Sequence, residues 1–185
     1  MGTEQGVSAE AARTRWGTLW HTLTAEERRE AALFYVTAAE RFPPGRAAIL
    51  AVLARDSRSR PRAVARWPIE RRADGLARMR SMDQPLLAAI LARFLVDARG
   101  PMVRRFLDLA GIVHHGGEID PALAAGERCD AERLMAAVRA VAAEFPPRDV
   151  ALFLGALEAQ RLPFLEGLAA ARRAPEGTIP LGGGA

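Results

Sequence analysis

Paired prolines are the feature that most restricts how this chain can fold. The pairs are Pro44 and Pro61, Pro85 and Pro101, and Pro147 and Pro163, and the members of a pair lie 17, 16 and 16 residues apart. Proline breaks a helix interior but fits well in a helix's first turn, so each pair is expected to bound a separate helix. Long uninterrupted helices are therefore excluded over most of the chain.

The residues between these prolines favour helix. Ala, Leu, Arg and Glu dominate, and all of them are good helix formers. Thr24 followed by Glu27 has the spacing of a capping box, which predicts a helix from this point to about Arg41. Pro44 is then expected in the first turn of the next helix.

The same pattern recurs three times. Each first proline is followed by the same type of apolar triplet: Ala48-Ile49-Leu50, Ala89-Ile90-Leu91 and Ala151-Leu152-Phe153. We predict three units of about 40 residues. Each unit consists of an amphipathic helix, a proline turn, an almost entirely apolar helix, a second turn and a shorter helix. The apolar helix should be buried on all sides, so the units should stack.

In period and helix alternation, residues 24–173 resemble HEAT and armadillo repeats. The resemblance implies an all-α fold of three helical repeats, arranged as a right-handed α-solenoid, and a helical bundle is the alternative. Residues 13–173 are expected to form a single helical-repeat domain between a flexible N-terminus, residues 1–12, and a flexible tail, residues 174–185. Trp16 and Trp20 should cap its open end, or alternatively anchor a partner.

An insertion separates the second and third units, because their first prolines lie 62 residues apart instead of 41. Residues 112–120 within it predict a small β-hairpin around Gly116-Gly117. One face of that hairpin carries His115, Glu118 and Asp120, which are candidate ligands for zinc or another transition metal. A solvated His–Glu pair on a protruding hairpin is the alternative. Apart from that metal hypothesis, no cofactor is expected.

Charge is unevenly distributed, although the net charge is only +4. Residues 41–105 hold fifteen Arg and five acidic residues, whereas the segments on either side are mildly acidic. The segment predicts a basic surface that binds a partner or an anion. The candidate binding residues are Arg55, Arg58, Arg60, Arg62, Arg66, Arg71 and Arg72, together with Trp67 and His114. GC-rich coding is the alternative explanation for the arginines, because the chain contains no Lys and no Asn.

Several classes of function are excluded. One Cys rules out a disulfide scaffold, and the absence of Lys rules out a P-loop and Schiff-base chemistry. No apolar run approaches the roughly 18 residues of a membrane span, and no leader segment is recognisable, so a cytoplasmic protein is expected.

Three functions stay open. The first is a non-catalytic protein-binding or scaffold module, and the opposite charges of its two ends would also allow self-association. The second is nucleic-acid binding through the arginines, as in alkylation-damage DNA glycosylases built from HEAT-like repeats. The third is a metal- or thiol-dependent enzyme around residues 112–129, which include Cys129.

Overall fold

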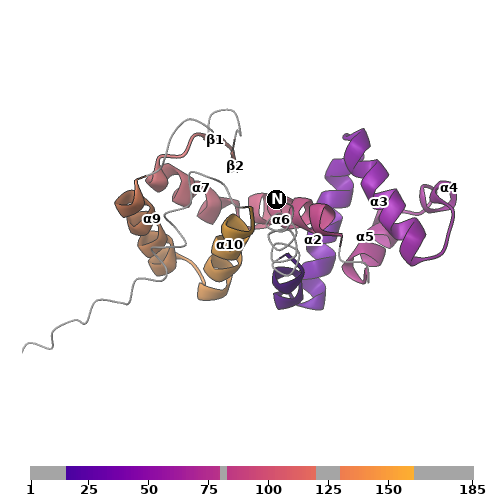
Figure 1. Cartoon of the computed structure of the whole chain (residues 1–185), viewed down its shortest axis with the longest axis horizontal. Helices are drawn as coiled ribbons and strands as arrows, with labels where there is room; N and C mark the ends of the chain where they lie inside the picture. The colour runs from indigo at the N-terminus through magenta and orange to yellow at the C-terminus, as the bar shows by residue number, and fades with distance from the viewer. Residues whose placement is uncertain (1–15, 80–82, 120–129, 161–185) are drawn as a thin grey trace, which may run out of the picture.

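A computed structural model describes residues 16–79, 83–119 and 130–160 of the chain (Figure 1). The regular elements among these residues are helices apart from one two-stranded hairpin, which confirms the all-α prediction. After a helical segment at residues 16–22, the elements are α2 (Ala25–Ala39), α3 (Pro43–Asp56), α4 (Pro61–Val64), α5 (Ile69–Ala77), α6 (Gln84–Ala98), α7 (Gly100–Ala110), β1 (His114–His115), β2 (Glu118–Ile119), α9 (Ala131–Glu144) and α10 (Pro147–Gln160).

The local signals for helix starts are confirmed. α3, α4, α6 and α7 each carry a proline in the first turn, and α10 begins at Pro147. Thr24 caps α2 through a complete capping box. Its hydroxyl accepts a hydrogen bond from the Glu27 amide at 3.1 Å, and the Glu27 carboxylate accepts one from the Thr24 amide at 2.7 Å. α2 ends at Ala39, two residues before the expected Arg41.

The core is built around α6. This helix lies in the middle of the molecule, with α2 to α5 on one side and α7 to α10 on the other (Figure 1). Its buried side chains are Leu86, Leu87, Ile90, Leu91, Phe94 and Leu95. α2 packs against both α5 and α6, and α7 packs against α9. Phe106 of α7 meets Phe153 of α10 edge to face, with ring centroids 5.1 Å apart.

The apolar helix of the first unit differs from the prediction. α3 buries Ile49, Val52 and Leu53, but Ala48 and Ala51 on another face are exposed. The prediction that each apolar helix is buried on all sides is therefore wrong for α3. The physical reason is that its exposed apolar residues are alanines, which leave little apolar surface in water.

The beginning of the described chain contacts its last described helix. Arg148 of α10 donates a hydrogen bond to the Thr22 carbonyl at 2.7 Å and another to the Glu27 carboxylate, also at 2.7 Å. Leu19 packs so closely on Gly155 that a Cβ at Gly155 would lie 2.7 Å from its Cδ2 atom. In an open solenoid a repeat contacts only its neighbours. Contact between the first and third units favours the bundle alternative, and the number of repeats stays a prediction.

Glu27 lies at the centre of this closure, with its side chain 18% exposed. Arg99 approaches the same carboxylate, with its Nη2 atom 3.9 Å from Glu27 Oε1. Burial alone would raise the pKa of Glu27. The hydrogen bonds from Thr24, and the charge and hydrogen bond of Arg148, outweigh that effect and hold the pKa below its ordinary value.

The tryptophans before α2 belong to the core. Trp16 is 6% exposed and Trp20 is 1% exposed. The alternative of an exposed aromatic anchor is therefore wrong, and the prediction that they cap the open end of a solenoid stays a prediction. The proposed flexible ends, residues 1–12 and 174–185, lie outside the described residues, and so do the outer parts of the predicted domain 13–173. Among the residues that the structure describes, no helix is both long and apolar enough to cross a membrane.

The predicted hairpin is present. β1 and β2 pair antiparallel, with His114 opposite Ile119 and His115 opposite Glu118. Gly116 and Gly117 have φ values of +64° and +105°. Positive φ at both central residues is what a primed two-residue turn requires, and glycine adopts it without steric cost.

Candidate functional site

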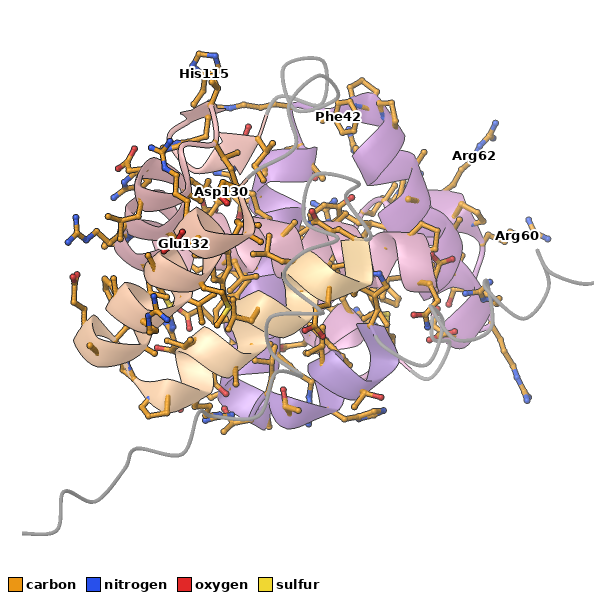
Figure 2. The ribbon with its side chains drawn as sticks, turned by 60° about the vertical axis from the view of Figure 1, so that its left-hand side comes forward. Phe42, Arg60, Arg62, His115, Asp130 and Glu132 are labelled. Carbon is orange, nitrogen blue, oxygen red and sulfur yellow. The ribbon has the colours of Figure 1, made fainter. Side chains whose placement is uncertain are left out.

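Most predicted partner-binding arginines lie at one end of the molecule, on α3, α4, α5 and their connections. Five of them are exposed and have no carboxylate within 4 Å among the described residues. We call these five the basic end: Arg58, Arg60, Arg62, Arg66 and Arg71. Arg60 and Arg62 project outward on the side of the molecule away from His115 and Glu132 (Figure 2). The five arginines thus come from elements that lie at the same end of the molecule (Figure 1).

Arginines elsewhere are paired more often. Of the ten arginines from residue 41 to residue 78, only Arg55 and Arg72 form an ion pair with a described carboxylate. In residues 83–119 and 130–160, four of seven do: Arg93, Arg99, Arg105 and Arg148. If coding bias alone explained the arginines, the fraction that forms ion pairs should be similar along the whole chain. Fewer of the arginines from residue 41 to residue 78 are neutralised by a described carboxylate.

Arg72 is a correction to the predicted binding set. Its side chain is only 5% exposed, and its Nη1 atom lies 2.6 Å from Glu40 Oε1 at the end of α2. Its Nε atom is buried and has no hydrogen-bond acceptor among the residues that the structure describes. α2 and α5 pack together here, so Arg72 is a structural residue between two helices and cannot meet a partner.

Trp67 has a structural position too, although it borders the basic end. The ring is half-buried against the core, and the Arg71 guanidinium lies over it, 4.3 Å from the ring centroid. Both residues line a shallow recess of about 260 Å³ with Arg78, and Leu53 and Met79 contribute apolar surface. The recess therefore combines two arginines with apolar side chains, and the carboxylate of Asp56 lines it as well.

Arg58 has an unusual backbone. Its φ of +52° lies in the left-handed region, directly after the Ser57 cap of α3. The backbone amide of Ser59 donates a hydrogen bond to the Ala54 carbonyl at 2.9 Å. This bond closes the helix end in the manner of a Schellman motif. Glycine normally occupies this position, because a side chain is strained there. Keeping an arginine at a strained position is consistent with a use for its charge.

His114 is part of the hairpin's own framework. Its Nδ1 atom accepts a hydrogen bond from the Gly117 amide, and its Nε2 atom lies 3.1 Å from the Asp108 carboxylate on α7. This arrangement fits a neutral ring with its proton on Nε2. Both ring nitrogens are occupied, so His114 anchors the hairpin to α7. His115 is exposed at the tip (Figure 2).

The predicted metal ligands are only partly placed. His115 and Glu118 are cross-strand partners, as predicted, but the Glu118 carboxylate receives a hydrogen bond from Arg93 at 3.1 Å. Asp120 and Cys129 lie outside the described residues. Among the residues that are described, no group of three or more His, Cys, Asp or Glu side chains has the arrangement of a metal site.

An apolar pocket of about 380 Å³ lies between the hairpin and the core, and sequence reasoning missed it. It is bordered by α2, α6, α7, α10 and the hairpin. Among its lining residues are Ala38, Ala39, Ala89 and Ala92, which leave space where larger side chains would fill it. Ala89 and Ala92 are three residues apart and share one face of α6, but the sequence does not show what that face meets. Tyr35 also lines the pocket, and burial raises the pKa of its hydroxyl.

Comparison of the chain with protein-family models, curated proteins and solved structures finds no match, so the site has to be interpreted from its own chemistry.

Proposed function

We propose that this protein is a non-catalytic binding module whose basic end holds an acidic protein partner. The single observation that carries the proposal is the group of five exposed arginines without a carboxylate partner among the described residues. Gathering like charges on one surface destabilises the folded chain through self-repulsion. An acidic partner would neutralise that repulsion when it binds. The positive charge of the surface would also attract the partner.

The recess beside the arginines supports a protein partner in particular. Arg and Trp are enriched at the energetic centres of protein interfaces, and apolar floors with polar rims are typical of such centres. Arg71, Arg78, Leu53 and Met79 all line the recess, together with one carboxylate, Asp56. A partner carboxylate beside an apolar side chain would match the two arginines and the apolar residues, provided that it meets the arginines away from Asp56.

Nucleic acid is the weaker alternative. Single-stranded nucleic acids bind aromatic rings by stacking, but the Trp67 ring is half-buried and Arg71 covers one of its faces. α4 is one helical turn of four residues, too short to present a recognition surface along a DNA groove. Phosphate contacts alone would still give salt-dependent binding, so duplex DNA belongs in the test as a competing ligand.

The test uses a triple variant with Arg58, Arg60 and Arg62 replaced by Ala. The ligand is a fluorescein-labelled peptide in which Glu and Asp alternate with Leu, and binding is measured by fluorescence anisotropy. Loss of three exposed charge contacts should weaken binding about tenfold, since contacts of ~0.5 kcal/mol each sum to ~1.5 kcal/mol. Thermal unfolding should change little, because all three side chains are exposed.

A second triple variant is the matched control. Arg104, Arg105 and Arg139 on α7 and α9 are also exposed, and replacing them with Ala removes the same amount of charge far from the basic end. If both triple variants weaken the peptide equally, only net charge matters and the proposal is wrong. Tighter binding of duplex DNA than of the peptide, with a steep dependence on salt, would favour the nucleic-acid alternative instead.

A further inference from the structure

The apolar pocket is distinct from the basic end. It opens beside the hairpin, where Gly117, Glu118 and Ile119 form one border, and Phe42 lies at another. Phe42 is 58% exposed, which is unusual for a large aromatic side chain. The volume of about 380 Å³ falls within the size range of pockets that hold small molecules.

The charged groups at the pocket neutralise one another. Arg93 donates hydrogen bonds to Asp97 at 2.6 Å and to Glu118 at 3.1 Å, so its guanidinium already has two carboxylate partners. An anionic ligand would have to displace one of them, and a cationic ligand would have to compete with Arg93. Burying a charge without a partner is costly, and the pocket offers no unpaired charge among its described lining residues.

Two uncharged polar side chains line the pocket, Tyr35 and Gln160, and of these Tyr35 is the more buried. The Tyr35 hydroxyl has no hydrogen-bond partner among the described residues, and it lies beside the turn that carries Phe42. A Cβ built on Gly45 would lie 3.3 Å from this hydroxyl and 3.0 Å from Phe42 Cδ1, so the two rings converge at that glycine. A phenol can donate one hydrogen bond and accept another.

We propose that this pocket binds an uncharged, mainly apolar small molecule that carries one hydrogen-bonding group, and that this group meets the Tyr35 hydroxyl. The apolar walls supply the affinity and the hydroxyl fixes the orientation, as in most small-molecule sites. The ion pairs of Arg93 select against charged molecules of the same shape. This inference concerns a second ligand and does not depend on the function proposed for the basic end.

The experiment titrates the full chain with N-phenyl-1-naphthylamine, an uncharged dye that fluoresces in apolar surroundings. We expect saturable binding of one dye per chain. Three competitors of similar shape then test the chemistry: 1-naphthol, naphthalene and 1-naphthoate. The expected order is 1-naphthol ahead of naphthalene, with 1-naphthoate the weakest. Competition by 1-naphthoate as strong as that by 1-naphthol would overturn the proposed selectivity.

Two substitutions locate the binding. Ala92→Leu places extra methylene groups in the pocket and should raise the dye's Kd at least about tenfold, a loss of ~1.4 kcal/mol. Ala51→Leu adds the same atoms to an exposed position of α3 and should leave the Kd unchanged. Equal Kd values for the two variants would place the dye elsewhere. If Ala92→Leu unfolds, Ala38→Leu fills the same pocket from α2.

Tyr35→Phe tests the hydrogen bond by itself. It should weaken 1-naphthol about three- to tenfold and leave naphthalene unchanged, since only the first has a hydroxyl group. Equal effects on both compounds would refute the role of the Tyr35 hydroxyl. A double variant with Phe164 and Leu165 replaced by Ser tests whether the chain's own C-terminal segment competes for the pocket. Stronger dye binding in that variant would make this segment the occupant and overturn the proposal.

Discussion

The ion pair between Arg72 and Glu40 predicts unequal costs for removing its two members. Arg72 is 5% exposed, whereas Glu40 is 32% exposed. Removing one partner from a buried ion pair costs ~3–5 kcal/mol, because the other charge is left buried and unpaired. Glu40→Ala leaves the buried guanidinium in that state, so we expect a loss of about 3 kcal/mol, at the lower end of the range because the pair is open on one side.

Arg72→Met should cost much less. The Glu40 carboxylate that remains is exposed enough to be hydrated, and methionine keeps much of the apolar volume of the arginine stem. The substitution also removes an Nε–H that is buried without an acceptor among the described residues. We therefore expect a loss of about 1 kcal/mol or less. The double variant should be about as stable as Arg72→Met alone, because the carboxylate has no partner once the guanidinium is gone.

Urea unfolding followed by tryptophan fluorescence measures these differences. The free energy of unfolding comes from the midpoint and the slope of the transition, and an unchanged slope shows that the unfolding reaction is the same in each variant. A loss of about 3 kcal/mol would be a large part of the roughly 5–15 kcal/mol that stabilises a typical domain. If Arg72→Met destabilised the protein as much as Glu40→Ala does, the argument from unequal burial would be refuted.

Three further predictions concern other single positions. Arg58→Gly should be more stable than Arg58→Ala by ~0.5–1 kcal/mol in urea unfolding, because glycine avoids the strain of φ +52° at the cost of some chain entropy. Equal free energies of unfolding for the two variants would contradict this. The lowered pKa of Glu27 stabilises the folded protein at pH values above the ordinary glutamate pKa, and this stability is lost as the pH falls through the folded-state pKa. In the Glu27→Gln variant the midpoint of urea unfolding should therefore depend less on pH across that interval. Gly111→Ala should cost at least ~1–2 kcal/mol, since φ is +70° and the new Cβ would lie 2.5 Å from Arg133 Cζ. Adding Arg133→Ala should recover part of that loss in the same urea assay, and no recovery would mean that the contact is harmless.

Local signals account for the features that were predicted correctly. Thr24 and Glu27 cap α2, and Gly116 and Gly117 form the hairpin turn, because each motif depends on residues a few positions apart. The proline positions locate helix starts for the same reason. Fold class follows from such signals when they agree with one another along most of the chain.

Features that depend on packing between distant segments were not predicted. The sequence shows Arg72 among other arginines, and only the packing of α5 on α2 makes it a buried partner of Glu40. The pocket exists because Ala89 and Ala92 of α6 face the short side chains of α2, and no pattern within one helix shows which face meets which. The exposed side of α3 has the same origin, because apolar composition does not say how many neighbours a helix has.

Contact between the first and last described helices also bears on how the chain folds. Arg148 and Gly155 lie more than 120 residues beyond their partners Thr22, Glu27 and Leu19. During synthesis the N-terminal helix must wait for α10 before these contacts form, and its apolar residues stay exposed to water until then. Once they form, neither end can detach without exposing part of the shared core. Unfolding should therefore be one cooperative transition in which the two ends lose hydrogen-exchange protection together, whereas a linear stack of repeats would fray from its ends.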